Sequence, residues 1–295
     1  MYNSPNAVLK GIKALFAKTL QGMQLSEVKK VMENVLSDGA YEDYWIPGNA
    51  NRIREWIDSI VYSDGKDYKF QIYNKDFGGG FKLKRTTLED SRKYLGGNVE
   101  NWVRGLAREW VSLPDEFVGI LLEKNGNAFD GTPFFANNRN LDTGSNTIDN
   151  IVSGTGTTQA QILADFDNAY NQLVSFKDKN NKPFNKNPKL AVIVPAHLTL
   201  TFKKIFSGEI KQLSSSTNIY AGMVEILTNY YQSNSSDDWY LVNLNSSMKP
   251  FILQERQKPT WDMKDEKDNV NIKYFTTGRY GYGYGNPLSI IKIDN

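Results

Sequence analysis

Apolar residues recur every three or four positions at the start of the chain, which predicts amphipathic helices. A stripe between residues 6 and 23 is flanked by lysines, and it consists of Val8, Ile12, Leu15, Phe16 and Met23. A second helix is expected over 26–36, because Ser26 can cap it and SDGAY ends it with a turn signal. The first stripe is short and weakly cationic, so an arm packing on a neighbour fits it better than a membrane-surface or transit helix.

Strict alternation replaces helical spacing between residues 63 and 89. The stretch DYKFQIYNKDFGGGFKLKR alternates apolar with polar residues on both sides of Gly78-Gly79-Gly80. This pattern predicts a β-hairpin with a glycine-rich tip. Two strands alone are marginally stable in water, so the hairpin is expected to lie on another surface.

The strongest helical pattern follows the hairpin and covers about six turns. Its apolar positions are Val99, Trp102, Val103, Leu106, Trp110, Leu113, Phe117, Ile120 and Leu121. Pro114 lies inside this stripe and costs about 3 kcal/mol in a helix interior but almost nothing in a first turn. We therefore expect the helix to break and restart at SLPDE, with Ser112 as the new cap.

The second half of the chain mixes helices and strands. Thr158 and Gln161 form a capping-box pattern that opens a helix ending near Phe176. KLAVIVP predicts a buried strand, a helix follows around 198–206, and MVEILTNYY and DWYLVNL predict two more strands. The order of elements predicts an α+β protein with an intervening compact lobe.

Two patterns near the C-terminus concern the faces of single strands. In KPFILQERQKPTW, alternation places Glu255 and Arg256 on opposite faces, so each charge needs its own partner. In GRYGYGYG, the tyrosines at 280, 282 and 284 share one face and the glycines the other. A glycine face allows another element to approach the backbone closely.

Composition limits the possible functions. The 295 residues are 40% hydrophobic and 13% aromatic, which is enough for one large domain or two ordinary ones. The 35 basic and 33 acidic residues give a net charge of +2, which does not mark a nucleic-acid-binding domain. The absence of cysteine excludes disulfides and Cys nucleophiles and fits a reducing compartment. We find no apolar run long enough for a membrane span and no signal-peptide pattern.

Candidate catalytic residues are scarce. The single histidine, His197, follows VIVPA, and a strand-end or helix-cap role fits it better than that of a general base. No nucleophile elbow, HExxH or P-loop is present, and SGTGTTQ lacks the third glycine of a dinucleotide-binding loop. We therefore expect no enzyme activity, no metal and no cofactor. The scarcity of catalytic motifs favours a protein that binds itself or other chains.

Several stretches resemble, in order, the Mu-type phage major head subunit family. KPFILQERQKP (249–259) is similar to that family's KPFI-QER-KP segment. The other similar stretches are SPNAVLKGIKALFAKTLQG (4–22), YWIPGNANRIREWI (44–57), LPDEFVGILL with FDGTPFFANNR (113–139), KLAVIVPAHL (189–198) and GRYGYGYGNP (278–287). Each alone is weak, but together they occur in the family's order, and the resemblance extends over essentially the whole chain.

The resemblance implies the tailed-phage capsid fold of the Hong Kong 97 type, which is α+β. It implies an N-terminal arm, an extended loop, a peripheral domain on a long spine helix, and an axial domain. The expected boundaries are 1–40 for the arm, 41–62 for the segment leading into the extended loop, 63–89 for the loop hairpin, 90–150 for the peripheral domain with its spine helix, 151–250 for the axial domain and 251–295 for strands returning to the peripheral domain.

The resemblance also implies a structural role in a virion, assembled in the cytoplasm of a bacterial host. The chain would form hexamers and pentamers of an icosahedral shell around double-stranded DNA, with weak nonspecific DNA contacts. A separate scaffolding or protease protein and a portal are the other expected partners, and no membrane is expected. The expected subunit-interface residues are Leu15, Phe16, Phe77, Phe81, Leu83, Lys84, Glu255 and Arg256.

Alternatives remain at this point. For Glu255 and Arg256, the alternative to a contact across a subunit boundary is an ion pair inside the peripheral domain. For the whole chain, an encapsulin-like compartment or a gene-transfer particle would use the same fold. A hydrolase with a carboxylate pair would instead be a monomer with a cleft.

Overall fold

The computed structural model describes residues 4–23, 26–47, 67–90, 97–140, 147–177, 183–206, 212–213, 216–233, 236–265 and 270–295. Its helices are α1 (Pro5–Gln21), η1 (Val28–Val31), α2 (Arg85–Asp90), α3 (Gly97–Lys124), α4 (Gln159–Ser175), η2 (Ala196–Leu198), α5 (Thr199–Phe206) and η3 (Pro287–Ser289). Its strands are β1 (Met32–Leu36), β2 (Tyr41–Pro47), β3 (Asp67–Tyr73), β4 (Lys75–Lys84), β5 (Ile151–Ser153), β6 (Leu190–Pro195), β7 (Gln212–Leu213), β8 (Ser216–Thr217), β9 (Val224–Asn229), β10 (Trp239–Asn243), β11 (Phe251–Lys264), β12 (Asn271–Tyr284) and β13 (Ile290–Asp294).

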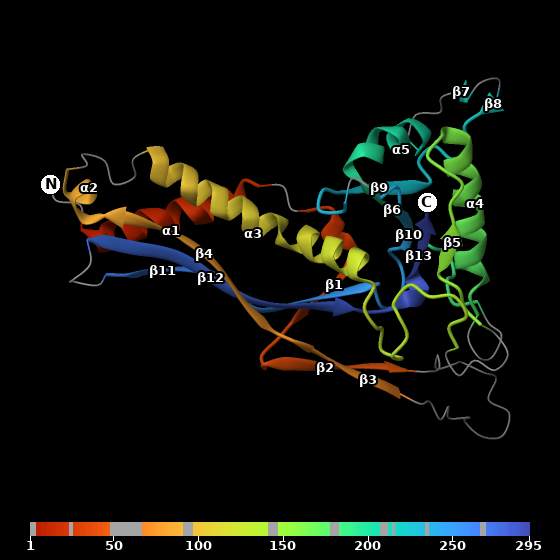
Figure 1. Cartoon of the computed structure of the whole chain (residues 1–295), viewed down its shortest axis with the longest axis horizontal. Coiled ribbons are helices and arrows are strands. Elements are labelled where there is room, and N and C mark those ends of the chain that lie inside the picture. The colour runs from red at the N-terminus through yellow and green to blue at the C-terminus, as the bar shows by residue number, and fades with distance from the viewer. Residues whose placement is uncertain are drawn as a thin grey trace.

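Two sheets lie at opposite ends of an elongated molecule (Figure 1). The four-stranded sheet has the order β1-β11-β12-β4, with β1 parallel to β11 and the other pairs antiparallel. The five-stranded sheet has the order β5-β13-β10-β6-β9 and is accompanied by α4 and α5. A separate ribbon of β2 and β3 crosses the four-stranded sheet, with β3 in contact with β12.

Helix α3 connects the two ends because its halves belong to different hydrophobic clusters. Its first half packs with α1 and with the far part of the four-stranded sheet, through Val103 and Ala107. Its second half contributes Phe117 and Leu121 to a cluster that contains residues of both sheets. A third cluster lies between the five-stranded sheet and α4 and α5. The sheets therefore share a core beside the C-terminal half of α3.

Most locally encoded elements are confirmed. The helix predicted over 6–23 is α1, capped by Ser4, which accepts from the Ala7 amide at 3.3 Å. Thr158 and Gln161 form the predicted capping box of α4. The KLAVIVP stretch is β6, a strand buried along its whole length. The predicted helix and strands over 198–243 are α5, β9 and β10.

The predicted break of the long helix at Pro114 is wrong. Helix α3 continues from Gly97 through Pro114 to Lys124. Ser112 is not a cap, since its hydroxyl donates to the Glu109 carbonyl at 3.2 Å. Proline removes one backbone donor, but the apolar stripe continues on both sides of it. Packing of both halves against the two clusters outweighs that local cost.

The second predicted helix, 26–36, is also mostly wrong. One turn of 3-10 helix ends at Val31, and Met32–Leu36 form β1. These five residues pair in parallel with β11, from Met32 opposite Phe251 to Leu36 opposite Glu255. Pairing with a strand more than two hundred positions away overrides the local helical pattern.

The predicted hairpin over 63–89 is wrong in its pairing. Strand β3 pairs with β2, whereas β4 pairs with β12 and belongs to the four-stranded sheet. Gly78-Gly79-Gly80 lies inside β4, not at a tip. A β-carbon at Gly80 would come within 2.5 Å of the Tyr274 carbonyl oxygen, and one at Gly79 within 2.8 Å of a Leu106 methyl. The glycines thus permit close packing in a strand.

The predicted boundary before residue 251 does not separate the sheets. Strands β11 and β12 belong to the four-stranded sheet, but β13 lies between β5 and β10 in the five-stranded sheet. The chain therefore crosses back between the sheets after Tyr284. Assignment of the two ends as peripheral and axial domains stays a prediction.

Candidate assembly surfaces and the junction between the sheets

Helix α1 uses its apolar stripe within its own chain. Val8, Ile12 and Phe16 are buried against α3 and the four-stranded sheet, and the ring of Phe16 packs edge-on against Trp261 at 5.6 Å. Leu15 is partly buried against the same cluster. The stripe therefore packs mainly within its own chain, and a place for Leu15 and Phe16 in a subunit interface stays a prediction.

The apolar residues expected on the extended loop also fill the chain's own core. Phe77 packs on Phe117 with ring centroids 5.2 Å apart. Phe81 packs on Trp102 at 5.2 Å, and Leu83 is buried in the same cluster as α1. Leu83 is buried and Phe77 and Phe81 are partly buried, since β4 is a strand of the sheet, and their place in a subunit interface stays a prediction. Lys84 is exposed, and its place in a subunit interface stays a prediction.

The outward face of the β2–β3 ribbon carries exposed aromatic and polar side chains. Tyr41 and Tyr73 are 43% and 58% exposed, and their ring centroids lie 5.3 Å apart. Gln71 donates to Asp43 at 2.9 Å and accepts from the Tyr73 hydroxyl at 3.1 Å. These contacts hold the side chains in place, and tyrosine-rich ordered surfaces are typical of protein interfaces.

An ion pair also helps to hold the side chains of this face in place. The Gln71 amide, followed by Lys69, holds the pKa of Asp43 below its usual range. Lys69 reaches Asp43 at 3.0 Å. This face was not predicted, because the predicted hairpin lay one strand later in the chain. Alternation in YEDYWIP was the signal that could have identified β2.

A second exposed apolar region lies near α5 and β9 on the five-stranded end. Leu200, Ile219, Met223 and Tyr230 are all exposed there. Scattered exposed side chains are ordinary, but several large ones around one helix and one edge strand favour a contact surface. Sequence periodicity gave no signal for it, because Ile219 and Met223 lie between regular elements.

Glu255 and Arg256 have separate partners within the chain. Glu255 lies 3.8 Å from Lys258. Arg256 donates to the Ser37 carbonyl at 3.5 Å and faces Glu42. The Ser37 hydroxyl and then the Gly39 and Asp38 amides lower the pKa of Glu42, with a smaller contribution from Arg256. These contacts support the internal alternative; a role across a subunit boundary stays a prediction.

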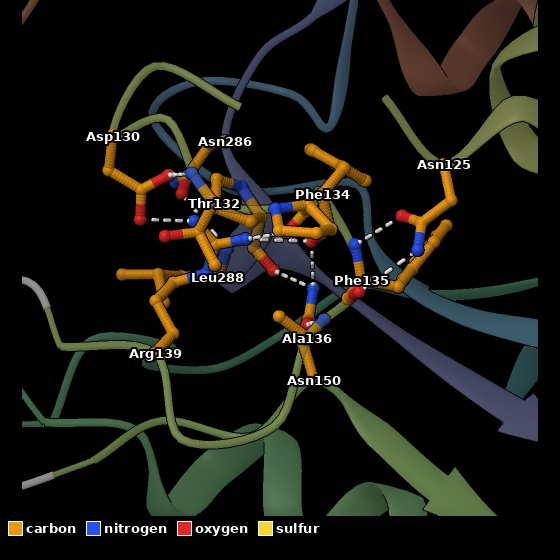
Figure 2. Close-up of polar contacts among 12 residues, drawn as sticks. Asn125, Asp130, Thr132, Phe134, Phe135, Ala136, Arg139, Asn150, Asn286 and Leu288 are labelled. Atoms are coloured by element: carbon orange, nitrogen blue, oxygen red, sulfur yellow. Dashed lines mark hydrogen bonds and ion pairs between the residues drawn. The ribbon is translucent and has the colours of Figure 1, made fainter. Parts of the chain in front are cut away.

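A buried polar network joins the end of α3 to the turn before β13 (Figure 2). Arg139 is 1% exposed and donates to Asp130 and to the carbonyls of Pro133 and Phe134. Asn150 donates to the Phe134 carbonyl at 2.8 Å and to the Pro287 carbonyl at 3.2 Å.

The same network closes the C-terminal end of α3. Asn125 exchanges two hydrogen bonds with the Phe135 backbone, at 2.7 and 3.1 Å. The segment FDGTPFFANNR is thus held between the sheets by its own Arg139 and Asp130 and by Asn125 and Asn150 on either side of it. Its chemistry is structural, because the buried charge of Arg139 is matched by Asp130 and by carbonyls.

Chemistry suited to catalysis is sparse in the part of the chain that the structure describes. His197 lies 2.8 Å from Asp237 at an exposed position. A cavity of about 220 Å³ beside the middle of α3 is lined mainly by apolar side chains, and Glu255 is the single carboxylate in its lining. Within the described ranges no cluster of three metal-binding side chains occurs, and no helix there is long and apolar enough to cross a membrane.

Comparisons with solved structures show the fold. The chain is similar to a subunit of the procapsid of bacteriophage JBD30, with 19% identity, a TM-score of 0.53 and coverage of 99% of this chain and 76% of that one. A capsid subunit of an empty GTA particle has 9% identity, a TM-score of 0.60 and coverage of 92% and 90%. A virus-like particle from Pyrococcus furiosus has 8% identity, a TM-score of 0.56 and coverage of 97% and 98%. No curated protein matches the sequence.

These likenesses establish the Hong Kong 97-type capsid fold predicted from the sequence. The family described as Mu-like prophage major head subunit gpT matches residues 6–166 and 227–287. The two matched ranges include α1, the ribbon, all of α3, the buried junction and the strands β11 and β12. The chain belongs to the Mu-like prophage major head subunit family.

Proposed function

We propose that this major capsid subunit forms hexamers and pentamers of an icosahedral shell that encloses double-stranded DNA. Membership of a head-subunit family carries the proposal, since such subunits form a multi-subunit shell. The ordered, exposed face of the β2–β3 ribbon and the apolar region near α5 supply surfaces for other copies. Assembly takes place in the cytoplasm of a bacterial host, with a separate scaffolding or protease protein and a portal.

The near balance of charge supports a container for DNA. The net charge of +2 gives an inner wall little general attraction for phosphate. Each contact with a phosphate adds to the affinity for DNA, and this contribution falls as the salt concentration rises. An inner wall with few such contacts therefore binds the enclosed DNA only weakly. Lys10, Lys13 and Lys18 on the exposed side of α1 could supply weak, sequence-independent contacts.

Similarity to the GTA capsid and to the virus-like particle favours two other shells as second candidates. Nuclease treatment of particles purified from the cells that produce this chain separates all three. For a phage head, we expect the protected DNA to have the same sequence in every particle. Protected fragments drawn from the whole host chromosome would instead indicate a gene-transfer particle with the same DNA-filled shell. Protein cargo without DNA would indicate a compartment and would contradict the proposal.

A further inference from the structure

Gln254 is a buried polar residue in an apolar part of β11. Its exposure is 0%, and Ile252 and Leu253 beside it are buried as well. Its amide nitrogen donates to the Tyr44 hydroxyl of β2 at 2.9 Å. Burial raises the pKa of Tyr44 to about 12, so this hydroxyl keeps its proton at neutral pH. The four-stranded sheet and the ribbon are thus connected by a partly buried hydrogen bond.

The glycine face of β12 lets the ribbon approach this point. Gly281 lies opposite Gln254 in the sheet, and Gly283 lies opposite Ile252. A β-carbon at Gly281 would collide with the Gln254 carbonyl oxygen and lie 3.0 Å from that of Asn74. A β-carbon at Gly283 would lie 2.8 Å from a methyl of Ile72 in β3. The expectation that another element approaches this face is confirmed, and the element is the ribbon.

Asn74 anchors the other strand of the ribbon at the same place. Its side-chain nitrogen donates to the Ser37 hydroxyl at 2.6 Å and to the Gly39 carbonyl at 3.0 Å. Its backbone amide donates to the Ala40 carbonyl at 2.9 Å. Gln254, Tyr44 and Asn74 therefore meet above Gly281, from β11, β2 and the β3–β4 connection.

The side-chain carbonyl oxygens of Gln254 and Asn74 are both buried without a hydrogen-bond donor. Such an orphaned acceptor costs about 1–3 kcal/mol. A half-turn of the Gln254 carboxamide would let Tyr44 donate to its oxygen and turn its nitrogen towards Asn74. A carboxamide suits this place in either orientation, because it carries both a donor and an acceptor.

We propose that Gln254 is a positioning residue whose hydrogen bond to Tyr44 holds the β2–β3 ribbon at one angle across the four-stranded sheet. We call this contact the latch. Among the described side chains between the ribbon and the sheet, Ile72 is buried and Tyr44 is half-buried. The ribbon keeps its own β2–β3 pairing without the latch, so loss of the latch frees its direction without melting it. The inference concerns the single chain and holds whatever the assembled particle contains.

Distance measurements between two spin labels test the latch, and the absence of cysteine makes site-specific labelling straightforward. Labels at Gln71→Cys on the ribbon and Arg108→Cys on α3 are placed at exposed positions of the full-length chain. Labelled chains are diluted with unlabelled ones, so that only distances within one chain are measured. One narrow distribution of label-to-label distances is expected for the unmodified Gln254. Gln254→Leu is expected to widen this distribution at least twofold while the melting midpoint of the rest of the chain stays unchanged.

Gln257→Leu is the matched control, since this exposed glutamine on the same strand has only a 3.4 Å contact with Thr260. It should leave the distribution unchanged. Tyr44→Phe removes the other partner's hydroxyl and should also widen the distribution, which keeps the test valid if Gln254→Leu does not fold. An unchanged distribution in Tyr44→Phe, or in a folded Gln254→Leu, would overturn the proposal.

Discussion

Replacing Arg139 by methionine is expected to lower the free energy of unfolding by about 3–5 kcal/mol, because it leaves a buried carboxylate without its partner. Arg139 and Asp130 are 1% and 6% exposed, so water cannot replace the lost contact. The Pro133 carbonyl loses the Arg139 donor in the same substitution, whereas the Phe134 carbonyl keeps the donor that Asn150 supplies. Urea unfolding followed by circular dichroism measures the change.

Arg104→Met is the control for this prediction. Arg104 lies on the exposed side of α3, 3.8 Å from Glu100, and a surface pair of this kind contributes about 0–1 kcal/mol. Both substitutions replace an arginine by methionine, one on the surface of a helix and the other in the buried junction between the sheets. Equal and small effects of the two substitutions would mean that the buried network does not hold the sheets together.

Replacing residues 48–66 by Asn-Gly is expected to abolish shells while leaving the subunit folded. Pro47 and Asp67 form the last pair of the ribbon, so a two-residue turn can close β2 and β3 there. Permanent interfaces commonly bury about 2,000–5,000 Å², and we expect residues 48–66 to supply part of that area. Sedimentation should show subunits or capsomers and at least a hundredfold fewer shells.

The melting midpoint of the truncated chain provides the control, and it should match that of the full chain. Removing residues 74–82 would not serve, because it takes out most of β4 and its pairing with β12. That variant is expected to unfold. Normal shells from the 48–66 replacement would show that the segment beyond the ribbon makes no essential contact.

Helices and strands with short-range signals could be predicted from the sequence. The stripe of α1, the capping box of α4 and the apolar run of β6 each lie within one element, and local packing is enough to specify them. Pairing could not be predicted in the same way. Gly78-Gly79-Gly80 resembles a turn locally, and its real cause is the close approach of Tyr274 and Leu106, distant in sequence.

The surfaces and the junction were predicted only in part. The alternation in KPFILQERQKPTW drew attention to Glu255 and Arg256, but Gln254 became important only once Tyr44 and Asn74 were placed beside it. Phe16 and Leu83 were expected on the surface because an apolar stripe does not indicate which molecule covers it. The burial of Arg139 could not be predicted from the sequence, because a buried arginine is recognised by its partners in space and not by its neighbours in sequence.

The central claim is that copies of this chain close into a hollow container. Electron microscopy of particles from cells that express the chain together with its flanking genes tests it most directly. We expect closed shells of uniform diameter in which this chain is the main protein, with the β2–β3 ribbon against an adjoining copy. A chain that stays single at every concentration, in cells and after purification, would contradict the account.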